Sequence, residues 1–154
     1  MKGMTIVEQA HVVVVLPPTS VTAAMSGVAF HMENWAHASI ICSGGAGSGL
    51  TMTIYECRDS AGSGATLIGF DYAEETTVDG DTLAAALAAA GTAGRAVGTS
   101  NVFLVAELDA DQLSDNYDWV RVNVDDPGTS RLLSIIAVLS GGRFQEDIVP
   151  TAIA

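Results

Sequence analysis

The stretch YDWVRVNVDDPGTSRLLSIIAVLS, residues 117–140, decides the fold. In residues 117–124, valines alternate with aromatic and polar side chains, which is the period-two pattern of a β-strand with one buried face. Residues 131–140 are apolar on both faces and rich in β-branched side chains, which indicates a central strand covered on both sides. DDPGTS between them places Pro and Gly at turn positions. The stretch therefore predicts two antiparallel strands joined by a short loop.

The same alternation recurs on the N-terminal side of this stretch. Gly-, Ser- and Pro-rich breakers separate the apolar runs at intervals of about 8–12 residues, a spacing typical of sandwiches and jelly rolls. We therefore predict an all-β, antiparallel β-sandwich or jelly-roll-like domain over residues 11–140, with extended arms at 1–10 and 141–154. The further strand candidates are 11–16, 26–31, 35–42, 50–57, 65–72 and 101–109.

One alanine-rich segment does not follow the period of two. GDTLAAALAAAG, residues 80–91, has the composition of a helix, with Asp81 or Thr82 as N-cap and Gly91 after its end. Its apolar face is thin, and a short helix without tertiary support is marginal in water. We expect either a short helix near 81–90 or an irregular crossover.

The composition and the net charge exclude some classes of binding partner. The chain has 154 residues and a net charge of −12, from 18 acidic and 6 basic side chains. Such a charge opposes binding to nucleic acid and to anionic membranes. The N-terminal apolar run is shorter than a secretory signal, and no run approaches the roughly 20 residues of a membrane helix. We expect a protein made in the cytoplasm that binds neither nucleic acid nor membrane.

The two cysteines are expected to be free thiols. If 35–42 and 50–57 form a hairpin, Cys42 lies near the loop and Cys57 at the far end of the ladder, roughly 23 Å away. A disulfide requires Cα atoms within about 7 Å of each other. We interpret both as small buried apolar residues.

The aspartate-rich segment 109–118 is superficially similar to a calcium loop. Counted from Asp109, the fifth position is Leu113 rather than an oxygen ligand, and the twelfth is Val120, inside a strand. We therefore predict a structural role: Asp109 or Asp111 caps a one-turn helix with Leu113 packed beneath it. Further on, Asp126, Pro127 and Gly128 form the turn of a hairpin.

Other residue types offer weak alternatives. His31 and His37 could share a sheet edge with Glu33 as metal ligands, but scattered surface histidines, His11 included, are the preferred interpretation. The aromatic side chains could form a sugar platform, although aromatic residues in strands more often belong to a core or an interface. Arg121 is expected to stack on an aromatic ring or to pair with an aspartate on its face.

Catalytic and cofactor motifs do not stand out in the sequence. Neither G-x-S-x-G nor a phosphate-binding P-loop is present, and no H-E-x-x-H occurs. We expect a protein that is not an enzyme and that uses no cofactor and no metal.

Residues 108–144 resemble a family of small tailed-phage proteins encoded near the major capsid protein gene. The shared pattern is a strand, a D-A-D-x-L turn, a VRVxxxDPG strand and turn, a final apolar strand and a short tail. PPTSVTAAMSGVAFHMENWAHASIIC near the N-terminus is also similar to the family's opening, whereas the Ala/Gly-rich segment 82–100 departs from it. The matching residues are Asp109, Ala110, Asp111, Leu113, Val120, Arg121, Val122, Asp126, Pro127, Gly128, Arg143 and Phe144.

The resemblance implies a virion structural protein, namely a capsid cement or decoration protein on the outside of the particle. Its partners would be the major capsid protein and further copies of itself, as a homotrimer, with Trp119, Arg121, Arg143 and Phe144 as candidate interface residues. Two alternatives remain open. One is a head–tail connector, tail or adhesin module of the same β class. The other is a calcium- or carbohydrate-binding domain that uses Asp109, Asp111 and Asp115.

Overall fold

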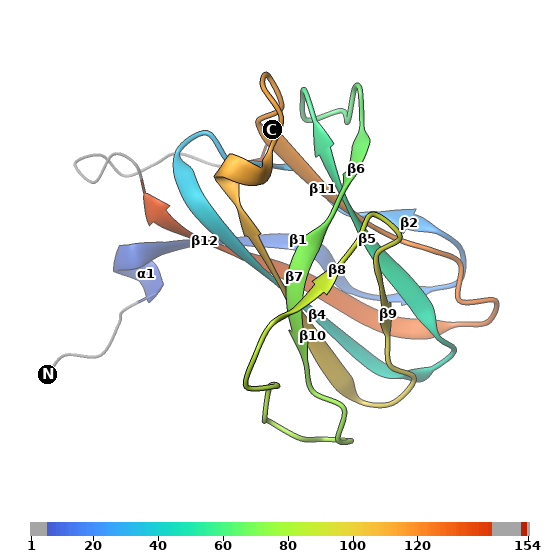
Figure 1. The fold of residues 1–154 in the computed structure, drawn as a ribbon. Coiled ribbons are helices and arrows are strands. Elements are labelled where there is room, and N and C mark those ends of the chain that lie inside the picture. The colour runs from blue at the N-terminus through green and yellow to red at the C-terminus, as the bar shows by residue number, and fades with distance from the viewer. Residues whose placement is uncertain (1–5, 143–151, 154) are drawn as a thin grey trace, which may run out of the picture.

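The chain folds into two sheets that enclose one apolar core (Figure 1). The computed structural model describes residues 6–142 and 152–153. All strand pairings within these residues are antiparallel. The predicted all-β antiparallel sandwich is confirmed. Within the same residues, no helix has the length and apolar character that a membrane span requires.

Sheet A is the larger layer and contains the long strands. Its order is β1-β12-β4-β10-β7-β8, so that β12 lies between β1 and β4 as the apolar sequence on both of its faces predicts. Its strands are β1 (Ala10–Val21), β12 (Arg131–Gly142), β4 (Trp35–Gly47), β10 (Val102–Asp109), β7 (Phe70–Glu74) and β8 (Ala88–Ala90).

Sheet B packs against sheet A and is built around two central strands. Its order is β2-β11-β5-β6, and two further strands join it, β3 beside β11 and β9 beside β5. Its strands are β2 (Met25–Ser26), β11 (Trp119–Val124), β5 (Leu50–Cys57), β6 (Thr66–Ile68), β3 (Phe30–His31) and β9 (Arg95–Val97). The two helical elements in the described part of the chain are single turns, α1 (Ile6–Gln9) and η1 (Ala110–Gln112).

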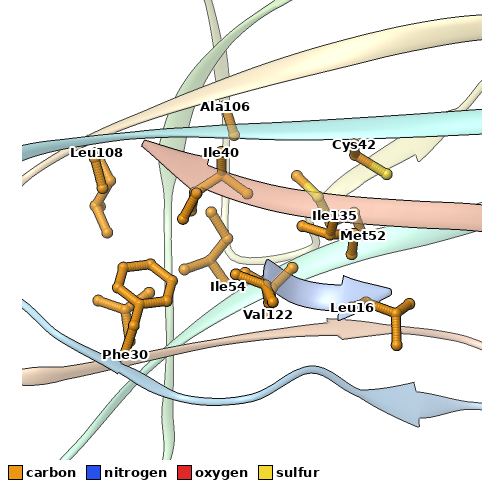
Figure 2. Close-up of a cluster of buried hydrophobic side chains, with 14 of the residues drawn as sticks. Leu16, Phe30, Ile40, Cys42, Met52, Ile54, Ala106, Leu108, Val122 and Ile135 are labelled. Atoms are coloured by element: carbon orange, nitrogen blue, oxygen red, sulfur yellow. The ribbon is translucent and has the colours of Figure 1, made fainter. Parts of the chain in front are cut away.

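The core forms where the inward faces of the two sheets meet (Figure 2). Strand β11 contributes its valines and β5 its even-numbered apolar residues, while the odd-numbered residues of β11 face outward. The period of two in the sequence therefore becomes an inside and an outside. Fully buried side chains from both sheets include Phe30, Ile40, Met52, Ile54, Val122 and Ile135.

The predicted hairpin between residues 35–42 and 50–57 is wrong. Strand β4 pairs with β12 and β10 in sheet A, whereas β5 pairs with β11, β6 and β9 in sheet B. The chain crosses between the sheets at Ser48 and Gly49, because β4 continues through its glycines to Gly47. Cys42 and Cys57 are both free and buried, as expected, but the pairing behind that expectation does not exist.

Of the two alternatives for residues 81–90, the structure has the irregular crossover and not the helix. The loop after β7 is held by the carboxylate of Glu75, which accepts hydrogen bonds from the backbone N–H groups of Thr77 (2.6 Å) and Thr82. Residues 81–89 are exposed, so a helix here would have no apolar face to bury. The chain is irregular until β8, and β9 follows within residues 91–100, which the sequence indicates as loop.

Most of the two predicted arms, residues 1–5, 143–151 and 154, lies outside the described residues. Strand β1 begins at Ala10, directly after the single turn α1, and β12 extends to Gly142. Near the C-terminus, Ala152 is buried in the core and its carbonyl accepts a hydrogen bond from the backbone N–H of His31 at 2.8 Å.

Candidate functional site

The outer face of sheet A, which points away from sheet B, exposes apolar side chains where strands β1, β12 and β4 lie side by side. The register pairs Val12 with Val138 and Val14 with Ile136, and Ile136 is in turn paired with Ile41 of β4. Because paired residues of antiparallel strands point to the same side, these side chains form one surface. The exposed fractions are 49% for Val12, 53% for Val14, 61% for Leu132 and 37% for Ile136, and we call this set the β1–β12 patch.

An acidic cluster borders the patch on strands β4 and β10. His37 lies between two carboxylates, with Nδ1 2.6 Å from Oδ1 of Asp109 and Nε2 2.7 Å from Oε2 of Glu107. Ser39 also donates a hydrogen bond to Glu107 at 2.6 Å. Partial burial lowers the pKa of His37, but the hydrogen bonds and charges of the two carboxylates outweigh it, so the pKa lies above the ordinary value of 6.5.

The first part of the aspartate-rich segment forms a turn at the end of β10. Asp109 is the N-cap residue of η1, and its backbone N–H donates to Oε1 of Gln112 at 2.7 Å. Leu113 packs partly buried against the core, while Asp111, Asp115 and Asp118 are exposed. In the part of the chain that the structure describes, no three His, Cys, Asp or Glu side chains are arranged to hold a metal ion.

The second part of that segment forms the loop between β11 and β12. Oδ1 of Asp126 accepts a hydrogen bond from the backbone N–H of Gly128 at 2.7 Å, and Gly128 has a φ of +73°. Pro127 between them is buried. Asp125 bonds back to Thr51 of β5, so that it extends the pairing of β11 with β5. The predicted hairpin is wrong: β11 pairs with β5 in sheet B and β12 pairs with β1 and β4 in sheet A, so this loop carries the chain from one sheet to the other.

A buried glutamate holds the loop that follows η1. Glu56 is 3% exposed, and its two carboxylate oxygens accept hydrogen bonds from the backbone N–H (2.7 Å) and the hydroxyl (2.8 Å) of Ser114. Without these donors the carboxylate would be a costly buried charge. Sequence reasoning missed this contact, because 58 residues separate the two partners.

The outer face of sheet B carries stacked aromatic and charged side chains. His31 stacks on Trp119 with ring centroids 4.7 Å apart, and the guanidinium of Arg121 lies 5.9 Å from the centre of the Tyr55 ring. His31 and His37 lie on different sheets, so the histidine–glutamate site considered from the sequence does not assemble with both. The other two candidate interface residues, Arg143 and Phe144, lie outside the described residues.

Arg131 lies buried between the sheets with 1% of its surface exposed. Its guanidinium donates to three backbone carbonyls: those of Ser48 (3.2 Å), Val97 (3.0 Å) and Gly98. Burial lowers the pKa of this group, whereas burial raises the pKa of the neighbouring Cys42 thiol to about 12. The arginine thus joins β12 to β9 and to the crossover between the sheets.

A cleft of about 480 Å³ opens beside strand β9. Val97, Val102 and Leu104 contribute apolar atoms to it, and Thr99 and Ser100 contribute polar ones. At its side, Arg95 binds the carboxylate of Glu74 through two nitrogens, at 2.5 and 3.1 Å, which raises the pKa of the arginine. The cleft has the size of a small-molecule site.

The comparisons with known proteins are sparse. No protein-family model matches the sequence, and no curated protein matches it significantly. A search of solved structures finds the crystal structure of SPBc2 prophage-derived protein YomS, with a TM-score of 0.49 and 12% sequence identity. The aligned region covers 84% of this chain and 92% of that chain.

Proposed function

We propose that this chain is a non-enzymatic capsid decoration protein of a tailed bacteriophage, which binds the major capsid lattice from outside and stabilises it. The observation that carries the proposal is the β1–β12 patch, whose four apolar side chains are between 37% and 61% exposed on one sheet face. Soluble proteins rarely expose a contiguous apolar surface, and such a surface commonly marks a site of contact with another molecule. The resemblance of residues 108–144 to phage proteins supports the capsid as the partner.

We expect the chain to stabilise the capsid by binding only to its assembled form. A protein that binds assembled capsid subunits and not dissociated ones stabilises the assembled state by the free energy of its binding. A rigid sandwich suits this task, because its face loses little conformational freedom when it docks. We also propose that the chain acts on the exterior of the virion as a homotrimer. In that arrangement the acidic surface would keep the particles apart in solution.

The proposal is tested with heads assembled without this protein. Such heads are heated or diluted in low salt, with and without added purified chain, and their integrity is followed by light scattering. We expect the added chain to raise the temperature of disassembly in a saturable way. Heads that are equally resistant with and without the chain would rule out stabilisation as its role.

The cleft beside β9 favours one second candidate, a tail, connector or adhesin module that binds a ligand. Its lining includes the glycine-, serine- and threonine-rich segment 98–100, and loops on a rigid scaffold commonly provide recognition surfaces. Copy number in purified particles separates the candidates. A decoration protein is present in hundreds of copies, whereas a connector or a tail-tip module is present in about a dozen or fewer.

A further inference from the structure

We infer that the β1–β12 patch docks on a protein surface of complementary chemistry, an apolar surface bordered by lysine or arginine side chains, and not on a second copy of this chain. The inference rests on the proposed function in one respect: it assigns that function to one face and states the chemistry of the partner.

The outer face of sheet A has the size of an interface. Strands β1, β12, β4 and β10 are neighbours in sheet A. With strands about 4.8 Å apart and about eight residues of usable length, they present on the order of 500 Å². One partner in a standard interface contributes roughly 800 Å². The patch with its border therefore covers much of the area that a stable contact needs, and loops at the rim would supply the remainder.

All charged side chains that the described strands place on this face are acidic, apart from His37. Glu107 and Asp109 extend from β10, and Asp71 of β7 is paired with Glu107 and so points to the same side. The four arginines of the described residues lie elsewhere. Arg131 is buried between the sheets, Arg95 binds Glu74, and Arg58 and Arg121 lie over Tyr117 and Tyr55.

This charge distribution decides against a second copy of the chain. Each copy has a net charge of −12, and a contact between two identical patches would bring two acidic borders into one interface. Like charges opposed across an interface cost several kcal/mol, whereas a basic border on the partner is attracted to Asp71, Glu107 and Asp109. The same face can therefore attract a basic partner while it disfavours contact with the identical face of a second copy, which leaves other faces for contacts within a trimer.

The histidine cluster couples this contact to protons. When His37 is protonated, its imidazolium neutralises part of the charge of Glu107 and Asp109. Among the described residues, the remaining neighbours add no cation: Ser140 of β12 is the residue paired with His37, and η1 beside β4 carries Asp111. A lysine or arginine of the partner would compete with the imidazolium for the same carboxylates. Docking therefore releases a proton, and affinity rises with pH through the titration of His37.

The first test compares two valines of equal exposure, Val14 at 53% inside the patch and Val78 at 54% in the loop after β7. Val14→Lys and Val78→Lys change the net charge equally, so any difference between them reports the location. We expect Val14→Lys to weaken binding to heads that lack this protein by about tenfold or more, and Val78→Lys to bind like the wild type. Melting temperatures of both variants confirm that they are folded.

The second test measures how binding depends on pH. Wild-type chain should bind such heads about threefold to tenfold more tightly at pH 8 than at pH 6, and His37→Asn should lose most of this dependence. Equal binding of Val14→Lys and wild type would overturn the assignment of the face while the decoration function stands. A chain that does not bind heads at all would refute the decoration function.

A third test does not depend on the capsid. On a mixed-mode resin that carries phenyl and amine groups, Val14→Lys should elute at lower salt than Val78→Lys, because only the former disrupts an apolar surface beside acids. Equal elution overturns the proposed chemistry of the partner. Analytical ultracentrifugation completes the test. If the wild type self-associates and Val14→Lys abolishes that association, a second copy covers the patch and the inference is wrong.

Discussion

Replacement of Arg131 by methionine should destabilise the sandwich strongly. Methionine keeps the length and apolar stem of the side chain but removes every donor to the three carbonyls of Ser48, Val97 and Gly98. A buried ion can often be exchanged for an apolar residue without loss when its partners are exchanged with it. Here the partners are backbone carbonyls, which stay behind in a site that is 1% exposed.

The size of the stability loss follows from the three carbonyls that stay buried after their donor is removed. Each hydrogen bond from a charged donor contributes about 1.5–3 kcal/mol, and the release of the guanidinium from its buried site returns several kcal/mol. The net loss for Arg131→Met should be about 3–5 kcal/mol, because three buried carbonyls lose their donor at about 1–3 kcal/mol each and the removed guanidinium returns part of that sum. In a chain of this length, that corresponds to a fall in melting temperature of about 10 °C.

Urea unfolding at pH 7 measures this loss, with Arg95→Met as the matched control. Arg95 binds a carboxylate near the surface with 37% of its side chain exposed, so its replacement should cost less than about 1 kcal/mol. Hydrogen exchange should also show that the amides of β9 lose protection in Arg131→Met, since two of the three carbonyls lie in or next to that strand. A loss below about 1 kcal/mol with β9 still protected would refute the reasoning.

Three further predictions concern other parts of the fold. Gly44→Ala should lower the unfolding free energy by about 1–3 kcal/mol, because the new Cβ would lie 2.5 Å from a guanidinium nitrogen of Arg131, whereas Gly91→Ala meets nothing within 4 Å and should be nearly neutral; urea titration of both variants decides this. The raised pKa of His37 should add stability that is fully present below about pH 6.5 and is lost as pH rises through the higher folded value, so the unfolding free energy of wild type should decline over that range more than that of His37→Asn. Cys42, whose pKa burial raises to about 12, should react with iodoacetamide at pH 8 only after unfolding, and modification of the native protein on the timescale of a small-thiol control would contradict its burial.

The architecture could be predicted because it depends on local pattern. The alternation in β11 and the two-sided apolar sequence of β12 place these strands in the interior of their sheets. DDPGTS is a loop between them, as predicted, but it crosses between the sheets and does not close a hairpin. The assignment of strands to sheets could not be obtained in this way. SGGAGSG, residues 43–49, has the composition of a hairpin loop, yet its first part extends β4 and the chain then changes sheet. The buried Arg131 holds this crossover. That partner lies 83 residues away in sequence from Ser48.

The alternative of a helix in the alanine-rich segment is wrong for a related reason. Helix propensity is a weak preference that tertiary contacts override, and here Glu75 holds the loop through backbone donors before any helix can begin. The cluster around His37 could not be predicted from the sequence either. His37 meets Glu107 and Asp109 only through the register of β4 with β10. The β1–β12 patch could have been predicted from the sequence. Both faces of residues 131–140 are apolar, and a single core covers only one face of a strand.

Strand β12 shows why an outward-facing apolar surface calls for a partner. Its inward residues, including Leu133, Ile135 and Leu139, are at most 2% exposed and complete the core without help from the other face. Leu132, at 61% exposure, therefore adds little to the core, and serine or threonine would keep the strand while removing a site of aggregation. An exposed leucine and isoleucine on a central sheet position are stabilising only when another surface covers them. The acids on β10 and β7 then restrict which surface can do so, since they repel like-charged copies and attract a basic border.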